Sequence, residues 1–329
     1  MGSNITGIGS YVPEEVLTNA DLEKMVDTSE EWIVTRTGIK ERRICPGDKA
    51  ASDLGTEAAR RAIADAGIEA SDVEMIICAT ITGDMIFPST ACVIQNNLGI
   101  ENVPCFDISA ACSGFIYGLE IARNFVDNGR YNKVLVVAAE CMSRVTDYKD
   151  RSTCVLLGDG SAAAIVERSD SNFGILDTYI AACGKFGNLL YVPAGGSRMP
   201  ATHETVENRL HYMKMEGSSL FRIAVVAMGE AVKKVLEKNK IGIEHLSMII
   251  PHQANIRIIQ AVARMLNFPM EKMFLNIEKY GNMSAASVGV ALDEAVKSKK
   301  VKKGDLVCMV SFGAGLTWAA NIMRWGKDD

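Results

Sequence analysis

Residues 106–125, FDISAACSGFIYGLEIARNF, are the stretch from which the fold can be worked out. The apolar start, 106–108, predicts the end of a buried strand, and the small side chains of 109–114 predict a sharp turn. Apolar side chains then recur three or four residues apart from Ile116 to Phe125, which predicts a helix. A strand that enters a helix through a tight turn is typical of α/β proteins.

A second copy of this pattern follows later in the chain. SAACSG at 109–114 aligns with SAASVG at 284–289, a shift of 175 residues. The same shift relates two further pairs of residues, Gly67 with Gly242 and Gly129 with Gly304. We therefore expect a duplicated fold in which Ser287 takes the place of Cys112.

Both halves alternate helices with nearly continuous apolar strands. The expected helices are 50–66 and 218–239, and the expected strands are 75–80, 134–140, 248–250 and 306–312. Such strands predict parallel-rich sheets covered by helices. The sequence thus predicts an α/β protein with α/β/α/β/α layers, built from pseudo-twofold related halves at 1–172 and 173–329. Residues 183–217 have no counterpart in the first half, so we expect an irregular insertion that lines a cleft.

The composition excludes several function classes. A chain that is 48 % hydrophobic with a net charge of −5 is neither disordered nor an evident nucleic-acid binder. No run approaches the ~20 apolar residues of a membrane span, and the N-terminus lacks a secretory signal. The nine cysteines include no C-x-x-C pair, which predicts neither a disulfide framework nor a metal site. We expect a cytoplasmic protein that binds no membrane.

Cys112 is the first candidate catalytic residue, because it stands where the predicted turn enters the helix. Free N–H groups and the positive end of the helix dipole favour a thiolate, so we expect its pKa to lie below ~8.5. The same N–H groups can hold the oxyanion that forms when a thioester carbonyl is attacked. The alternative is a small buried side chain, which we expect for the other eight cysteines.

Two more candidates lie at junctions of the second half. His252 follows an apolar strand, at the end of a strand where sites gather in α/β proteins, and Asn282 lies on the turn into the partner helix. A lone histidine is often a core residue and an Asn-Gly turn is often only a turn. Pseudo-twofold packing would bring both helix starts together, so we expect Cys112, His252 and Asn282 to converge in one cleft.

Several segments resemble β-ketoacyl-acyl carrier protein synthase III, the thiolase-fold enzymes that start bacterial fatty acid chains. The matching segments are EEWIVTRTGIKER (30–42), DISAACSGF (107–115), RSTCVLLGDGSAAA (151–164), PHQANIR (251–257), YGNMSAAS (280–287) and SFGAGLTW (311–318). The resemblance implies a thiolase-like fold and an acyltransferase that condenses a short acyl-coenzyme A with malonyl-acyl carrier protein. It implies that Cys112 is acylated and that His252 and Asn282 assist decarboxylation. No cofactor is implied, since coenzyme A is part of a substrate.

The resemblance also implies residues that bind coenzyme A. Trp32 and Arg36 match positions that hold its adenine and phosphates, and Arg151 matches another residue on that path. Asn255 matches a polar residue near the pantetheine arm, and Gly217 one beside the acyl pocket.

Further matches concern the partners. Phe312 matches a gating phenylalanine, and Phe87 matches one that crosses a homodimer into the partner's acyl pocket. Arginines expected on the face that meets the acidic carrier protein are Arg257, Arg222 and Arg264. Met265 departs from the pattern, because some relatives carry a second basic residue there.

Three other functions remain open at this point. A thiolase would need a second catalytic cysteine in its C-terminal half, but the terminal FGAG has none and Cys308 lies inside an apolar strand. A ketosynthase or acyltransferase of secondary metabolism could keep the same three residues. A non-catalytic carrier-protein-binding module would have no need of them. The sequence does not fix the choice of primer.

Overall fold

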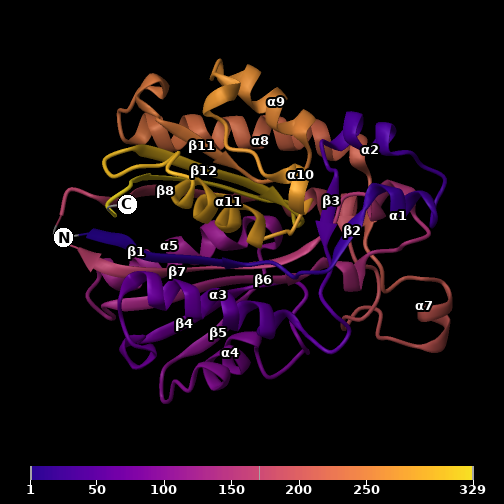
Figure 1. Ribbon diagram of the computed structural model, residues 1–329, viewed down its shortest axis with the longest axis horizontal. Helices are drawn as coiled ribbons and strands as arrows, with labels where there is room; N and C mark the ends of the chain where they lie inside the picture. The colour runs from indigo at the N-terminus through magenta and orange to yellow at the C-terminus, as the bar shows by residue number, and fades with distance from the viewer. Residues whose placement is uncertain (1, 170, 328–329) are drawn as a thin grey trace.

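The computed structural model describes residues 2–169 and 171–327, which form two large sheets separated and covered by helices, and two small two-stranded sheets (Figure 1). The spatial order of the first sheet is β1 (Gly2–Tyr11), β7 (Asp159–Ser169), β6 (Lys133–Cys141), β4 (Met75–Ala79) and β5 (Cys105–Ile108). β4 runs parallel to β5 and β6, whereas β6 with β7 and β7 with β1 are antiparallel.

The second sheet repeats this order. It contains β11 (Met248–Pro251), β12 (Leu306–Gly313), β13 (Thr317–Arg324) and β8 (Gly174–Ala182). β11 is parallel to β12, and the other two pairs are antiparallel. A single parallel bridge from Ile249 to Met273 stands where β5 pairs in the first sheet. The duplication is therefore confirmed, while the exact division at 172/173 stays a prediction.

The strand registers correct the expected shift between the halves. Met75 pairs with Val134 in the first sheet, and Met248 pairs with Val307 in the second. Both members of the second pair lie 173 residues after those of the first, whereas the sequence matches predict 175. Matches between short runs of Ser, Ala and Gly do not define a register as closely as backbone pairing does.

The turns before the inner helices give the same correction. Ala111 has φ 46° and Ser284 has φ 47°, and each lies in the turn that enters the inner helix of its half. Cys112 therefore corresponds to Ala285, and the prediction that Ser287 takes its place was wrong.

Six helices complete the predicted five layers. Between the sheets lie α5 (Gly114–Asp127) and α11 (Ala286–Lys297). The outer face of the first sheet is covered by α3 (Ala51–Ala66) and α4 (Thr90–Leu98), and that of the second by α8 (Gly217–Lys238) and α9 (Ile256–Leu266). Figure 1 shows α8 and α9 on one side of the stack and α3 and α4 on the other.

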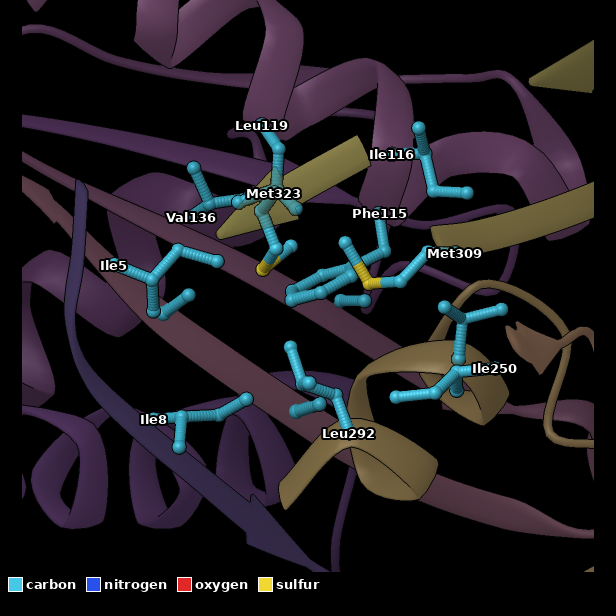
Figure 2. Close-up of a cluster of buried hydrophobic side chains, with 14 of the residues drawn as sticks. Ile5, Ile8, Phe115, Ile116, Leu119, Val136, Ile250, Leu292, Met309 and Met323 are labelled. Atoms are coloured by element: carbon cyan, nitrogen blue, oxygen red, sulfur yellow. The ribbon is translucent and has the colours of Figure 1, made fainter. Parts of the chain in front are cut away.

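The central core lies between the two sheets and joins the halves. Figure 2 shows Phe115 of α5 among side chains from both sheets, including Ile8 of β1 and Met309 of β12. α11 passes close to the first sheet at Gly289, where a Cβ would lie 2.5 Å from that of Ala162. Each large apolar side chain buried here contributes about 1.5–3 kcal/mol, so the halves fold as one body.

The remaining elements are shorter. They are β2 (Val16–Thr18), β3 (Glu41–Arg43), α1 (Asn19–Glu23), α2 (Glu30–Thr37), α6 (Arg151–Cys154), α10 (Ile277–Tyr280), β9 (Leu190–Tyr191), α7 (His203–Glu207) and β10 (Lys214–Met215). The last three belong to the predicted insertion, which Arg209 ties to the buried carboxylate of Asp147. Within the described residues, no helix has both the length and the apolar character to cross a membrane.

Candidate active site

Cys112 lies in a 3-10 turn, Ala111–Ser113, between β5 and α5. The second sheet fixes this turn, because the Ser311 hydroxyl of β12 donates a 2.6 Å hydrogen bond to the Cys112 carbonyl oxygen. A Cβ on Gly313 would lie 2.6 Å from the Cys112 nitrogen. Glycine is therefore required for β12 to pass so close to the candidate nucleophile.

Cys112, His252 and Asn282 line one cavity of about 140 Å³. A larger cavity of about 400 Å³ also reaches Cys112 and Asn282. Most of its lining is apolar, including Ile81, Met142, Val145, Leu156, Leu157, Leu190, Met213 and Met215. Three of these residues, Leu190, Met213 and Met215, come from the 183–217 insertion, as the sequence predicts. The halves thus bring a sulfur, an imidazole and a carboxamide into one place.

Burial sets the protonation of the cysteine and the histidine. It raises the pKa of Cys112 to about 12 and lowers the pKa of His252 to about 4. The expectation that the helix start lowers the pKa of Cys112 was wrong, because loss of solvation outweighs the turn's N–H groups. At neutral pH the pair is therefore a thiol and a neutral imidazole.

The side chain of Asn282 is oriented by its own turn. Its Oδ1 accepts a 2.8 Å hydrogen bond from the backbone N–H of Ser284, and its backbone N–H donates to the Leu156 carbonyl at 2.8 Å. With Oδ1 engaged in this way, the Nδ2 donors remain for the cavity.

The position of His252 is fixed by the residues on each side of it. Its backbone N–H donates to the Val310 carbonyl of β12 at 2.8 Å. The fully buried side chain of Gln253 donates to the carbonyls of Pro251 and Phe274 and accepts from the N–H of Asn276. Gln253 therefore links the end of β11 to the segment that contains Phe274 and Asn276 by hydrogen bonds.

The residues predicted to bind coenzyme A fall into two groups. Asn255 and Gly217 line the cavity with Cys112, at the starts of α9 and α8. Trp32 forms a separate group with two cations, the guanidinium carbons of Arg151 and Arg36 lying 5.0 and 5.8 Å from its ring centroid. A flat ring beside two exposed cations suits a purine with phosphates.

The two predicted phenylalanines differ in exposure. Phe312 of β12 is buried and lines the cavity that contains His252. Phe87 lies on the loop between β4 and α4 and is 82 % exposed, so it does not enter the cavity of its own chain.

Arg222, Arg257 and Arg264 are all exposed, the first on α8 and the others on α9. These two helices pack together. Met265 makes part of that contact, since its sulfur lies 2.5 Å from where a Cβ of Gly229 would be. An apolar side chain at Met265 therefore has a packing role.

The sequence reasoning missed Glu140 and Ser284, both of which have no exposed surface. Glu140 lies near the end of β6, and Ser284 precedes α11. The available signal was a carboxylate at the end of an apolar strand, VLVVAAE at 134–140, where α/β proteins place functional residues.

Both parts of the chain that contribute to this site match known protein families. Residues 106–184, which include Cys112, match the family model of 3-oxoacyl-[acyl-carrier-protein] synthase III. Residues 236–325, which include His252 and Asn282, match the model of the same enzymes' C-terminal part. The chain belongs to the β-ketoacyl-acyl carrier protein synthase III family.

Whole-chain similarity to members of the synthase III family is extensive. The chain is 56 % identical to the β-ketoacyl-[acyl-carrier-protein] synthase III of Caldanaerobacter subterraneus, over 99 % of both chains. The crystal structure of the Aquifex aeolicus 3-oxoacyl-[acyl-carrier-protein] synthase III is 48 % identical, with a TM-score of 0.92 over 98 % of this chain and 100 % of that one. The priming β-ketosynthase of the R1128 polyketide pathway is 35 % identical, with a TM-score of 0.92 over 100 % and 97 %.

Membership of the synthase III family confirms the thiolase-like fold and the condensing, acyltransferase class of the enzyme. It does not favour the polyketide alternative, because the fatty acid relatives are the more similar ones. A thiolase is also disfavoured, since Cys308 is buried in β12 within the core formed with α8 and α9.

Proposed function

We propose that this chain condenses a short acyl-coenzyme A with malonyl-acyl carrier protein, releases carbon dioxide, and so initiates fatty acid synthesis. The observation that carries this proposal is the single cavity lined by Cys112, His252 and Asn282. These groups provide a nucleophile for acyl transfer and two neutral donors for a developing enolate.

In the first step the Cys112 sulfur attacks the thioester carbonyl and coenzyme A leaves. The N–H groups of the Ala111–Ser113 turn would stabilise the oxyanion. The apolar cavity of about 400 Å³ beside Cys112 would receive the acyl chain.

In the second step the malonyl group loses carbon dioxide, and negative charge develops on its thioester oxygen. His252 is a neutral donor because its pKa is lowered to about 4, and Asn282 has its Nδ2 donors available. One donor of this kind is worth about 3–4 kcal/mol in the transition state. The enolate carbon then attacks the acyl-cysteine, and no metal or redox cofactor takes part.

The coenzyme A path runs from the Trp32 group to the cavity. Arg36 and Arg151 would bind its phosphates beside the Trp32 ring, and Asn255 and Gly217 would flank the pantetheine arm and the acyl chain. Phe312 would gate the cavity.

The carrier protein would dock on α8 and α9. Arg257 is the second residue of α9 and lies two residues after Asn255, which lines the cavity. A carrier bound at Arg257 would therefore reach Cys112 through its pantetheine arm. Arg222 and Arg264 extend this exposed positive face, which complements an acidic carrier.

A homodimer in the cytoplasm is part of the proposal. Phe87, Ile86 and Met85 are 82 %, 88 % and 53 % exposed, and an apolar loop of this kind marks an interface. In the dimer Phe87 would close the partner's acyl pocket. All nine cysteines are free, which supports a reducing compartment.

Turnover with malonyl-acyl carrier protein and a series of acyl-coenzyme A primers of rising length tests this function. We expect 3-oxoacyl-carrier protein, carbon dioxide and free coenzyme A in equal amounts, with the shortest primers fastest. Absence of the condensed product with every primer would contradict the proposal.

A further inference from the structure

Glu140 is a buried carboxyl group to which the proposed chemistry gives no role. Its Oε2 accepts hydrogen bonds from the Thr82 hydroxyl at 2.5 Å, the Ile81 N–H at 3.2 Å and the Thr80 hydroxyl at 3.3 Å. All three donors are neutral. Burial of a carboxylate without a cation is costly, so its presence beside the site points to a function.

Ser284 lies between Glu140 and the nucleophile. Its N–H donates at 2.8 Å to Asn282 Oδ1, and Asn282 lines the cavity with Cys112. The Cβ of the next residue, Ala285, lies 3.3 Å from where a Cβ of Gly114 in the first turn would be. In keeping with this position, the Ser284 side chain lowers the pKa of both Cys112 and Glu140. Neither approach has full hydrogen-bond geometry, and within 2–169 and 171–327 both the Ser284 Oγ and the Glu140 Oε1 are buried without a partner. Two neighbouring polar atoms thus have unused hydrogen-bonding capacity behind Cys112.

Glu140 is able to exchange a proton near neutral pH. Burial raises its pKa to about 7. The turn before α11 faces it with the Ser284 hydroxyl and the Ala285 N–H, neither of which is charged. The titratable groups that sense its charge are Cys112 and, on β4, Cys78. Asp84 and Asp107 are further charges that act on Cys78.

We propose that Ser284 and Glu140 form a proton relay for Cys112, a refinement that rests on the proposed function. As the bond from the Cys112 sulfur to the acyl carbon forms, the thiol proton passes to the Ser284 oxygen, and the Ser284 proton passes to Glu140. The bond from the acyl carbon to the coenzyme A sulfur breaks, and the departing thiolate takes a proton from solvent.

Condensation then runs the relay backwards. The malonyl carbon–carboxylate bond supplies the electron pair of the enolate, whose carbon bonds to the acyl carbon as the bond to the Cys112 sulfur breaks. The sulfur recovers its proton from Ser284, which takes one from Glu140. One solvent proton is consumed per turnover, which balances the release of uncharged carbon dioxide from a carboxylate.

In this scheme His252 and Glu140 have different roles beside the Cys112 thiol. His252, with a pKa of about 4, holds a proton poorly at neutral pH and serves as a neutral donor. The pKa of Glu140, about 7, is close to that of an efficient general base at neutral pH. Glu140 is a positioning residue in this scheme, because it reaches the sulfur only through Ser284.

The test is the rate of Cys112 acylation by acetyl-coenzyme A without malonyl substrate, followed by intact-mass spectrometry between pH 5.5 and 9.5. Wild-type enzyme should accelerate through a transition near pH 7. Glu140→Gln should lose this transition and acylate about 100-fold more slowly at pH 7, with the deficit shrinking at high pH. Glu140→Asp should recover part of the rate.

A second relay variant and a control variant complete the test. Ser284→Ala removes only the hydroxyl and should match Glu140→Gln, even if the latter folds poorly. Asp293→Asn changes another buried carboxyl group, on the α11 face that contacts Ser10 and Lys297, and should keep the wild-type pH profile. A wild-type rate and profile in Ser284→Ala would overturn the relay, whereas no adduct in the wild-type enzyme would instead contradict the proposed function.

Discussion

The turns that enter α5 and α11 have the same backbone and different side chains. Ala111 and Ser284 have φ values of 46° and 47°, and both turns are buried at the centre of the molecule. The first turn carries Cys112, whereas the second carries Ala285 at that position and has Asn282 just before it. The same backbone conformation thus lies beside the proposed nucleophile in one half and beside a carboxamide in the other.

The difference teaches how a duplicated fold divides a two-step reaction. In this account Cys112 of the first half forms the acyl-enzyme with help from Ser284, and His252 and Asn282 of the second half provide the donors for decarboxylation. Substitutions of Cys112 and of Asn282 should therefore impair different steps.

The largest effect is expected for Cys112→Ala. Incubation with acetyl-coenzyme A should add one acetyl group to wild-type protein and none to the variant, as measured by intact-mass spectrometry. Cys92→Ala is the matched control, because Cys92 is a partly exposed thiol on α4 and should keep the adduct. An adduct that survives Cys112→Ala would assign the nucleophile elsewhere.

Asn282→Ala should show the opposite pattern. Acylation of Cys112 should persist, while condensation falls about 100- to 1000-fold, because one donor to the enolate oxygen is lost. Single-turnover assays that follow the acyl adduct and the 3-oxoacyl product measure acylation and condensation separately. Equal losses in both steps would mean that Asn282 supports the turn at Cys112 and not the second half-reaction.

Acid should destabilise the second half through His252. Its pKa falls from 6.5 to about 4 on folding, so between these values the unfolded chain binds a proton that the folded chain refuses. Stability should therefore decrease as the pH falls from 6.5 to 4, by about 3 kcal/mol from this group. Urea unfolding of wild type and His252→Gln at both pH values measures this, and an unchanged pH dependence in the variant would contradict it.

Arg257→Glu should affect only the substrate of the second step. Reversal of one surface charge should raise KM for malonyl-acyl carrier protein about tenfold and leave KM for acyl-coenzyme A unchanged. Arg130→Glu, beyond the end of α5, is the control for a general charge effect. Equal changes in the two KM values would remove the carrier-specific role.

The smallest effect concerns the corrected register. Ser287 corresponds to Gly114, and its hydroxyl accepts the Met283 N–H at 2.9 Å inside the turn. Ser287→Ala should cost about 1 kcal/mol in chemical unfolding and leave acylation intact. If it abolished acylation, the Ser287 hydroxyl would have a role at Cys112 that the corrected register does not give it.

The sequence predicts the layers, because strands buried on both faces form continuous apolar runs and the inner helices keep their spacing. α3, observed at Ala51–Ala66, and α8, observed at Gly217–Lys238, lie within a residue of their predicted bounds. The shift of 175 failed because Gly67 and Gly129 match Gly242 and Gly304 only through turn composition. Strand pairing, which sets the shift at 173, is not visible in such turns.

Cys112, His252 and Asn282 could be selected as candidates because each follows a strand end or precedes a helix. The pKa of Cys112 could not be predicted, since it depends on burial by the opposite half. Glu140 and Ser284 were missed for a related reason. Nothing in the local sequence shows that a carboxyl group of β6 and a hydroxyl before α11 lie close to each other and to Cys112.

The most direct test of the divided site is release of labelled carbon dioxide from malonyl-acyl carrier protein by variants of each half. The account predicts that Cys112→Ala, which cannot be acylated, still releases carbon dioxide, whereas His252→Ala and Asn282→Ala do not. Loss of carbon dioxide release in Cys112→Ala together with its persistence in the other two variants would contradict the account.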